Sequence, residues 1–113
     1  MPFISAKTNR TLSEGEKIAL KEKLGEAIAI IPGKSERWLM ISFEDGLTMS
    51  FAGDMSATAM IDVELFGSTT EAAYAKLTAE ITRIVSEVAG IPENRIYVKY
   101  REVDVWGYSG ENF

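Results

Sequence analysis

The sequence predicts an α/β (α+β) fold in which duplicated β-α-β units form a four-stranded mixed sheet with two helices on one face. Two observations predict it: the chain repeats itself weakly at an offset of 57 residues, and each half has apolar spacing typical of strand, helix and strand. We expect these elements over residues 2–8, 12–31 and 38–43, then 57–66, 69–89 and 95–101. The duplication thus covers roughly 2–43 and 57–101 of a single domain, 1–113, with each pair of strands parallel.

The two predicted helices share start signals, apolar spacing and stop signals. Thr11-x-x-Glu14 and Ser68-x-x-Glu71 are typical of capping boxes that open a helix. Gly33 and Gly90 occupy matching positions and are predicted to terminate the helices. The apolar positions of the two halves correspond at amphipathic spacing: Leu20, Leu24, Ala27, Ile28 and Ile31 match Leu77, Ile81, Ile84, Val85 and Val88.

Alternation along the strands predicts two unlike faces of the sheet. The face that the helices cover carries Ile4, Ala6, Leu39, Ile41, Ile61, Val63, Leu65, Ile96 and Val98. The opposite face carries Phe3, Ser5, Lys7, Trp38, Met40, Ser42, Met60, Asp62, Glu64, Tyr97, Lys99 and Arg101. Sheets with parallel pairs are usually covered on both faces, and no third helix remains. We therefore expect self-association through this open face, the alternative being a monomer whose sheet is half solvated.

Two segments lie outside the duplicated units. Leu47–Phe51 is expected to add a short strand after a turn at Glu44-Asp45-Gly46. The tail from Val103 to Phe113 is rich in aromatics and has neither helical nor strand periodicity. We expect it to dock on a neighbouring element or subunit.

Composition excludes several classes of function. The net charge of −5 without a Lys/Arg cluster argues against nucleic acid as a partner. No run approaches the roughly 18 apolar residues of a membrane span, and no signal segment opens the chain, so a cytoplasmic location is the expectation. Zero cysteines and zero histidines exclude disulfides, a thiol nucleophile, an imidazole base and an ordinary zinc site. An acid or base must then be a carboxylate, Lys, Tyr or the N-terminal amine.

Pro2 is the candidate base. A small second residue favours removal of Met1, which would leave proline with a free secondary amine. An α-amino group titrates near ~7.7–8.0, and desolvation or nearby cations lower that value. Such an amine is suited to general base catalysis near neutral pH. The alternative is that Pro2 is only a common, protease-resistant second residue, and with Met1 retained it would be an amide.

A set of residues spread along the chain resembles the tautomerase superfamily, and within it the family of macrophage migration inhibitory factor (MIF) and D-dopachrome tautomerase. The residues that carry the resemblance are Met1-Pro2-Phe3-Ile4, Thr8-Asn9, Gly33-Lys34, Trp38, Phe51-Ala52-Gly53, Ala57–Leu65 with Phe66-Gly67, Pro92-x-x-Arg95-Ile96-Tyr97-Val98, Trp106-Gly107-Tyr108 and Asn112-Phe113. Their order and spacing span essentially the whole chain.

The resemblance implies a homotrimer whose three sheets form a barrel with six helices outside. It further implies keto–enol tautomerisation of a small anionic keto or enol acid such as phenylpyruvate, without metal or cofactor. Pro2 would move the proton between the carbon beside the carbonyl and the enol oxygen.

The resemblance also implies the binding residues. Lys34 falls on the lysine that binds the substrate carboxylate, and Phe66 on a position whose backbone N–H contacts substrate. Tyr97 matches a tyrosine supplied by the adjacent subunit, and Trp106 and Tyr108 lie at the pocket rim, where they could hold an aromatic substrate ring. Lys99 replaces a usual asparagine and would add positive charge near the pocket. Alternatively, Lys34 is an ordinary lysine beyond a helix end, and the aromatic residues serve packing or a subunit interface.

Other functions stay open at this point. Superfamily members that hydrate or dehalogenate unsaturated acids add arginines and an acidic residue, roles for which Arg37 and Glu64 are available. Arg37 could also supply a second carboxylate contact for a dianionic substrate, the alternative being a solvated loop charge. A MIF-like signalling or binding protein with vestigial activity is another class, and a plain structural oligomer is a third.

Overall fold

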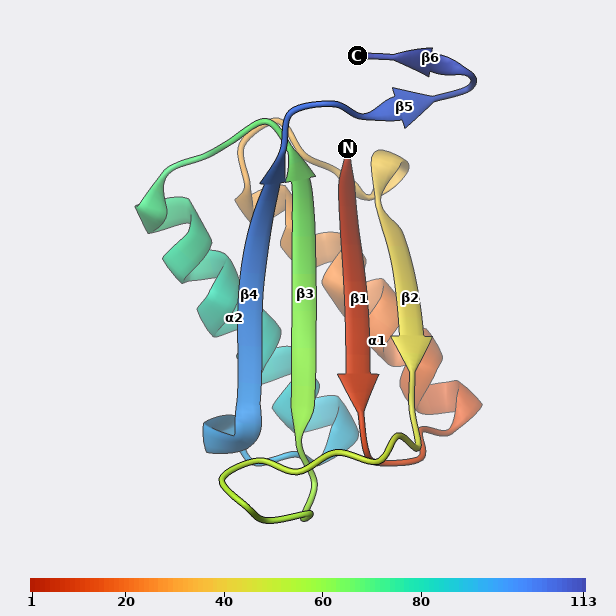
Figure 1. The fold of residues 1–113 in the computed structure, drawn as a ribbon, viewed down its shortest axis with the longest axis vertical. Helices are drawn as coiled ribbons and strands as arrows, with labels where there is room; N and C mark the ends of the chain where they lie inside the picture. Colours follow the sequence, from red (N-terminus) through yellow and green to blue (C-terminus); the bar gives the residue numbers. More distant parts are fainter.

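Two helices cover one face of a four-stranded sheet in the computed structural model, which describes residues 1–113 (Figure 1). The strands lie in the order β2-β1-β3-β4, with β1 parallel to β2, β3 parallel to β4, and β1 antiparallel to β3. The elements are β1 (Pro2–Thr8), α1 (Glu14–Ala27), β2 (Met40–Glu44), β3 (Ala59–Phe66), α2 (Glu71–Ala89) and β4 (Ile96–Val103). The predicted mixed sheet, with adjacent parallel strands in each half, is confirmed.

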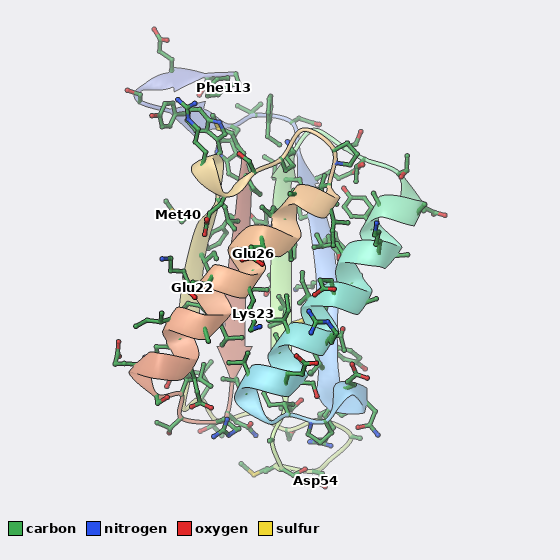
Figure 2. The ribbon with its side chains drawn as sticks, turned by 180° about the vertical axis from the view of Figure 1, so that it is seen from behind. Glu22, Lys23, Glu26, Met40, Asp54 and Phe113 are labelled. Carbon is green, nitrogen blue, oxygen red and sulfur yellow. The ribbon has the colours of Figure 1, made fainter.

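The predicted division of the sheet into two faces is also confirmed. Ile4, Ile61 and Val63 are buried under the helices, whereas Tyr97 on the other face is 55% exposed. The core consists of apolar side chains from β1, β3, both helices, the loop before α1 and the segments that follow the helices: Ile4, Ala6, Leu12, Leu20, Leu24, Ala27, Ile28, Ile31, Ala59, Ile61, Val63, Leu65, Leu77, Ile81, Ile84, Val85, Ala89 and Ile91. Viewed from the helix side, Glu22, Lys23 and Glu26 lie on the outer surface of α1 (Figure 2). No helix is both long and apolar enough to cross a membrane.

Both helices begin two residues later than their predicted capping boxes. Ser13 caps α1, because its hydroxyl accepts from the Glu16 N–H while the Glu16 carboxylate accepts from the Ser13 N–H. Thr70 caps α2 by accepting from the Ala73 N–H, with no reciprocal acidic side chain. The predicted boxes Thr11-x-x-Glu14 and Ser68-x-x-Glu71 are therefore wrong, although the true caps still occupy matching positions of the two halves.

The helix ends differ between the halves. Gly90 ends α2 in the left-handed conformation, as predicted, at a φ of 67° that favours glycine. The predicted first helix over 12–31 is too long, because α1 ends at Ala27 and continues as a 3₁₀ turn, η1 (Ile28–Ile30). Gly33 also has a positive φ but lies in the loop beyond that turn rather than at the helix end.

Three further boundaries correct the predictions. Leu47–Phe51 forms no strand, and only an isolated bridge joins Phe51 to Asp54. Trp38 belongs to a 3₁₀ turn, η2 (Glu36–Trp38), rather than to the second strand. The tail, which shows no strand period in sequence, folds into a short hairpin of β5 (Gly107–Tyr108) and β6 (Glu111–Asn112).

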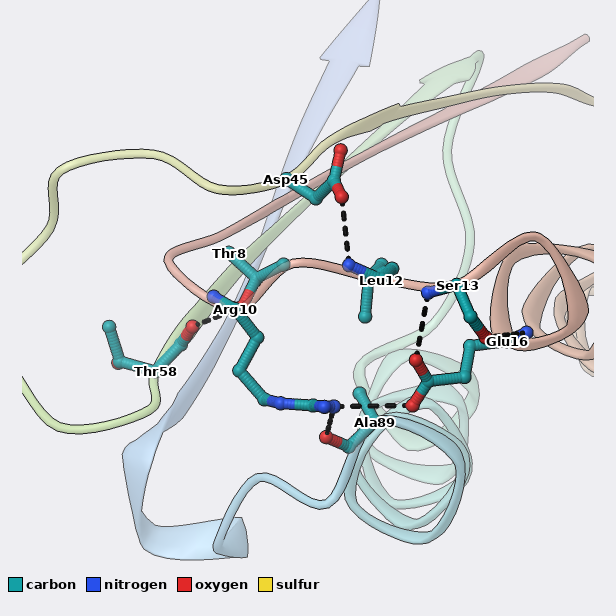
Figure 3. A network of polar contacts seen from close by, with 8 residues as sticks. All are labelled: Thr8, Arg10, Leu12, Ser13, Glu16, Asp45, Thr58 and Ala89. Carbon is teal, nitrogen blue, oxygen red and sulfur yellow. Dashed lines mark hydrogen bonds and ion pairs between the residues drawn. The ribbon is translucent and has the colours of Figure 1, made fainter.

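A network of polar contacts joins the start of α1 to the end of α2 (Figure 3). Arg10, in the loop after β1, donates to the Glu16 carboxylate at the start of α1 and to the Ala89 carbonyl at the end of α2. Asp45, after β2, accepts from the Leu12 N–H at 2.8 Å. Of these contacts, the one to the Ala89 carbonyl satisfies a backbone group that the end of α2 leaves without a partner.

A second polar clamp fixes the irregular loop between β2 and β3. The Asn9 side chain donates to the Met55 and Ser56 carbonyls, both at 3.0 Å, and accepts from the Thr58 N–H at 3.0 Å. Arg95 donates to the carbonyls of Ala57, Asp54, Ser56 and Phe51 at 2.9, 3.0, 3.2 and 3.4 Å. The loop therefore has a defined conformation without a strand of its own.

Replacing a core side chain tests the packing of helix against sheet. Ile81 is fully buried, so Ile81→Ala should lower the free energy of unfolding by about 2–5 kcal/mol. Ile18 on α1 is 54% exposed, and Ile18→Ala should change it by less than about 0.5 kcal/mol. Urea denaturation of both variants measures the difference, and equal losses would contradict this account of the core.

Removing the Arg95 donors tests the loop clamp. We expect Arg95→Met to lower the free energy of unfolding by about 1–3 kcal/mol, since several charge-assisted bonds are lost. Backbone amides of residues 51–57 should also exchange hydrogen faster in the native state. Arg83→Met, which removes only contacts to Glu80 and Glu87 on the surface of α2, is the control. Identical exchange of the loop in both variants would show that Arg95 does not hold it.

Candidate functional site

The beginning of the chain lies beside the end of β3. Pro2 pairs with Leu65, which places Met1 next to Phe66. The Phe66 N–H donates to the Met1 carbonyl at 3.0 Å, and the Lys34 Nζ donates to the Phe66 carbonyl at 2.8 Å. Pro2 itself is almost completely buried. Two donors, the Lys34 ammonium and the Phe66 N–H, are thus held close to the N-terminal amine.

The surroundings of the amine favour its neutral form. Burial, followed by the charge and hydrogen bonding of Lys34, lowers the pKa of the Met1 amino group from 8.0 to about 6. Both causes penalise the protonated amine, because it loses solvation and sits beside another cation. An amine at this place is therefore mostly unprotonated at pH 7.

A cavity of about 440 Å³ opens beside this amine. Its wall is largely aromatic: the Trp38 and Tyr108 rings meet edge to face with centroids 5.2 Å apart. The Arg37 guanidinium lies over the Trp38 ring, with its central carbon 5.1 Å from the ring centroid. The lining residues are Met1, Pro2, Phe3, Arg37, Trp38, Leu39, Met40, Glu64, Trp106, Gly107 and Tyr108.

The C-terminal hairpin forms the roof of this cavity. The Phe113 N–H donates to the Trp106 carbonyl at 2.9 Å, which closes the hairpin, and the Phe113 ring lies 6.2 Å from both Phe66 and Tyr108. Figure 1 shows the hairpin at the same end of the sheet as the N-terminus. The expected docking of the tail therefore occurs within the chain, on η2 and on the end of β3.

The structure brings four of the predicted site residues together and leaves two apart. Pro2, Lys34, Phe66 and Trp106 meet at one end of the sheet, as described above. Tyr97 lies at the opposite end of β4, where its ring packs on Phe51 at a centroid distance of 4.9 Å. Within one chain it is therefore remote from Pro2.

Lys99 is the second residue that stands apart. It lies midway along β4, and its Nζ is 3.0 Å from a carboxylate oxygen of Asp62, which also lies 3.8 Å from the Lys7 Nζ. Within one chain its charge is directed at this carboxylate rather than at the cavity. No three acidic side chains converge to hold a metal ion.

The part of the aromatic wall that sequence reasoning missed is Trp38, because Tyr108 is already expected at the pocket rim. Trp38 was expected on a strand of the open face, and its contact with Tyr108 joins segments 70 residues apart in sequence. A signal was present, because Trp38 follows Lys34 in the short loop that returns to the sheet edge. An aromatic residue so close to a candidate carboxylate-binding lysine was a candidate for the same cavity.

Comparison with known proteins identifies the family. The model of the macrophage migration inhibitory factor (MIF) family matches residues 1–112. The structure of Leishmania major MIF2 is similar with a TM-score of 0.94 at 29% identity, over 100% of this chain and 97% of that one. That of macrophage migration inhibitory factor from Toxoplasma gondii has a TM-score of 0.91 at 22% identity, over 98% and 99% of the two chains.

One further solved structure shares the fold, and its name includes that of a small organic compound. It is Pt0534 inactivated by 2-oxo-3-pentynoate, with a TM-score of 0.81 at 21% identity over 96% of this chain and 93% of that one. A search of curated protein sequences finds no significant match. Since the family model covers all but the last residue and the fold agrees throughout, the chain belongs to the macrophage migration inhibitory factor (MIF) family.

Proposed function

We propose that this protein is a cofactor-independent keto–enol tautomerase for 2-oxo acids of the phenylpyruvate type, with the Pro2 amine as general base once Met1 is removed. The observation that carries the proposal is the N-terminal amine held beside Lys34 and the Phe66 N–H, next to an aromatic-walled cavity. This combination offers a base, a cation for a carboxylate and a wall for a ring. No other part of the chain offers all three.

The base follows from the position of Pro2. Removal of Met1 makes the Pro2 nitrogen a secondary amine, buried and adjacent to the place where the Met1 amine now has its pKa lowered to about 6. Burial and the charge of Lys34 would lower the pKa of the Pro2 amine in the same way. A base that is neutral near pH 7 and still basic enough to accept a proton is suited to this reaction.

The substrate would occupy the place of Met1. Its removal would release the Phe66 N–H from the Met1 carbonyl and clear the space in front of Lys34. Lys34 would bind the carboxylate of the 2-oxo acid, and the Phe66 N–H would donate to a substrate oxygen. Pro2 would take a proton from the carbon beside the carbonyl, and the C–H electron pair would form the carbon–carbon double bond while the carbonyl π pair moves to the oxygen. Pro2 would then give the proton to that oxygen.

We further propose that the protein is a homotrimer, as is implied by the resemblance stated above. Tyr97 and Met40 are large, exposed and on the face of the sheet that the helices leave uncovered. Tyr97 lies at the far end of the sheet from Pro2 of its own chain. A neighbouring subunit would therefore have to bring it to the cavity.

One comparison supports an acidic 2-oxo compound as the ligand class. Pt0534, which shares the fold, was inactivated by 2-oxo-3-pentynoate, whose name describes a 2-oxo acid. An acid of this class would meet the Lys34 ammonium with its carboxylate. The positive charge of Lys34 is therefore complementary to the negative charge of such an acid.

The hydratase or dehalogenase alternative needs a free acidic residue to activate water. Glu64 lines the cavity, but its carboxylate lies 3.7 Å from the Arg101 guanidinium and is also on the open face of the sheet. Because this ion pair holds the carboxylate toward β4, we place this alternative second.

Replacing the secondary amine tests the base. For protein whose N-terminus is shown by mass spectrometry to begin at residue 2, Pro2→Gly should lower kcat/KM for phenylpyruvate tautomerisation by about 10²-fold or more, since general base catalysis typically contributes 10²–10⁴-fold. The rate is followed in the ultraviolet. Equal rates in the two proteins would exclude Pro2 as the base, and absence of activity in both would exclude this substrate.

The pH dependence tests the role of Lys34 in holding the amine neutral. A neutral base is required, so kcat/KM should rise with pH and level off above the pKa of the Pro2 amine, which we expect burial and Lys34 to lower as they lower that of the Met1 amine. Lys34→Met removes a cation, so the rising limb should move to higher pH while KM increases. Lys21→Met, which removes an exposed charge on α1, should leave the limb in place. A limb that does not move in the Lys34 variant would contradict this role.

A further inference from the structure

We infer that Arg37 is a specificity-determining residue, and that the cavity selects dianionic 2-oxo acids with a second carboxylate at the end remote from the 2-oxo group. The inference rests on the proposed function, because it concerns the same cavity and deepens the choice of substrate. The observation behind it is that the Arg37 guanidinium has no acidic or carbonyl partner in the chain.

Arg37 differs from every other arginine of the chain. The other four all have partners: Arg10, Arg83 and Arg95 donate hydrogen bonds to carboxylates or backbone carbonyls, and Arg101 forms an ion pair with Glu64. The Arg37 guanidinium has no hydrogen-bond or ion-pair partner, and its only specific contact is with the face of Trp38. Because none of its N–H donors has an acceptor within the chain, all of them are available to a carboxylate.

The acidic side chains near Arg37 are engaged elsewhere. Glu36 directly precedes Arg37, but its carboxylate is packed against α1. It lies so close to Gly25 that a side chain on that residue would collide with it. Glu64 lines the cavity and pairs with Arg101 at 3.7 Å. The positive charge of Arg37 is therefore not neutralised by a neighbouring side chain.

The two cations of the site lie in different places, and only Arg37 both lines the cavity and lacks a hydrogen-bond partner. Lys34 is directed at Phe66 and the N-terminal amine, where the 2-oxo acid group would react. Arg37 lies on Trp38, which belongs to the aromatic wall and is itself held by Tyr108. A ligand with one carboxylate can satisfy only one of these cations. A ligand with a flat ring along the wall and a carboxylate at each end would satisfy both.

This selection can be tested with two substrates that differ only in a carboxylate on the ring. The ratio of kcat/KM for 4-carboxyphenylpyruvate to that for phenylpyruvate should be about ten in the wild type, equivalent to about 1.4 kcal/mol. In Arg37→Gln the ratio should fall to about one or below, whereas Lys21→Gln, with the same change of net charge, should keep it. The wild-type ratio should also decline with added salt, because Arg37 is exposed.

Binding of unreactive analogues separates this inference from the proposed reaction. Calorimetric titration of wild type and Arg37→Gln with cinnamate and 4-carboxycinnamate needs no turnover. If 4-carboxycinnamate binds more tightly than cinnamate, and the difference is lost in Arg37→Gln, the selection is supported. This holds even if neither keto acid reacts, and in that case only the tautomerase proposal fails. Equal affinities of the wild type for the two cinnamates, or a preference that survives in Arg37→Gln, would overturn the inference.

Discussion

The antiparallel pairing of β1 with β3 is the constraint on which the candidate site depends. It joins the two β-α-β units, and its register sets Pro2 opposite Leu65, so that Phe66 lies beside Met1. Lys34 reaches the same point by donating to the Phe66 carbonyl. A shift of one residue would turn every side chain of β1 to the other face and remove Ile4 from the core. The stability of the core and the geometry of the site are therefore fixed by the same pairing.

The face that the helices leave open balances its charges within the chain. Asp62 lies between Lys7 and Lys99, at 3.8 and 3.0 Å, and Glu64 lies 3.7 Å from Arg101. Exposed ion pairs of this kind contribute little to stability. They do, however, leave few unpaired charges that a second subunit would have to desolvate. Association through this face would therefore be driven by its apolar side chains rather than by its charges.

The fold could be predicted from the sequence because it rests on periodicity and repetition, both of which are local. The exact helix starts could not, because Thr11 and Ser13 are both suitable caps with a glutamate three residues later. The role of Lys34 was predicted from resemblance to a family rather than from its spacing. The wall of Trp38 and Tyr108 depends on a contact between a loop and a hairpin far apart in sequence, which no local pattern encodes.

The two halves of the duplication use equivalent turns for different purposes. The 3₁₀ turn Glu36–Trp38 matches the 3₁₀ turn Glu93–Arg95 at the same offset of 57 residues that relates the helices. Because the halves run antiparallel, the turns lie at opposite ends of the sheet, where Trp38 forms the cavity wall and Arg95 clamps a loop. At the position that matches Lys34 the second half has Ile91, which is buried in the core. The fold thus offers two equivalent ends: at one, Lys34 lies beside the N-terminal amine, whereas at the other the cation, Arg95, is bonded to loop carbonyls.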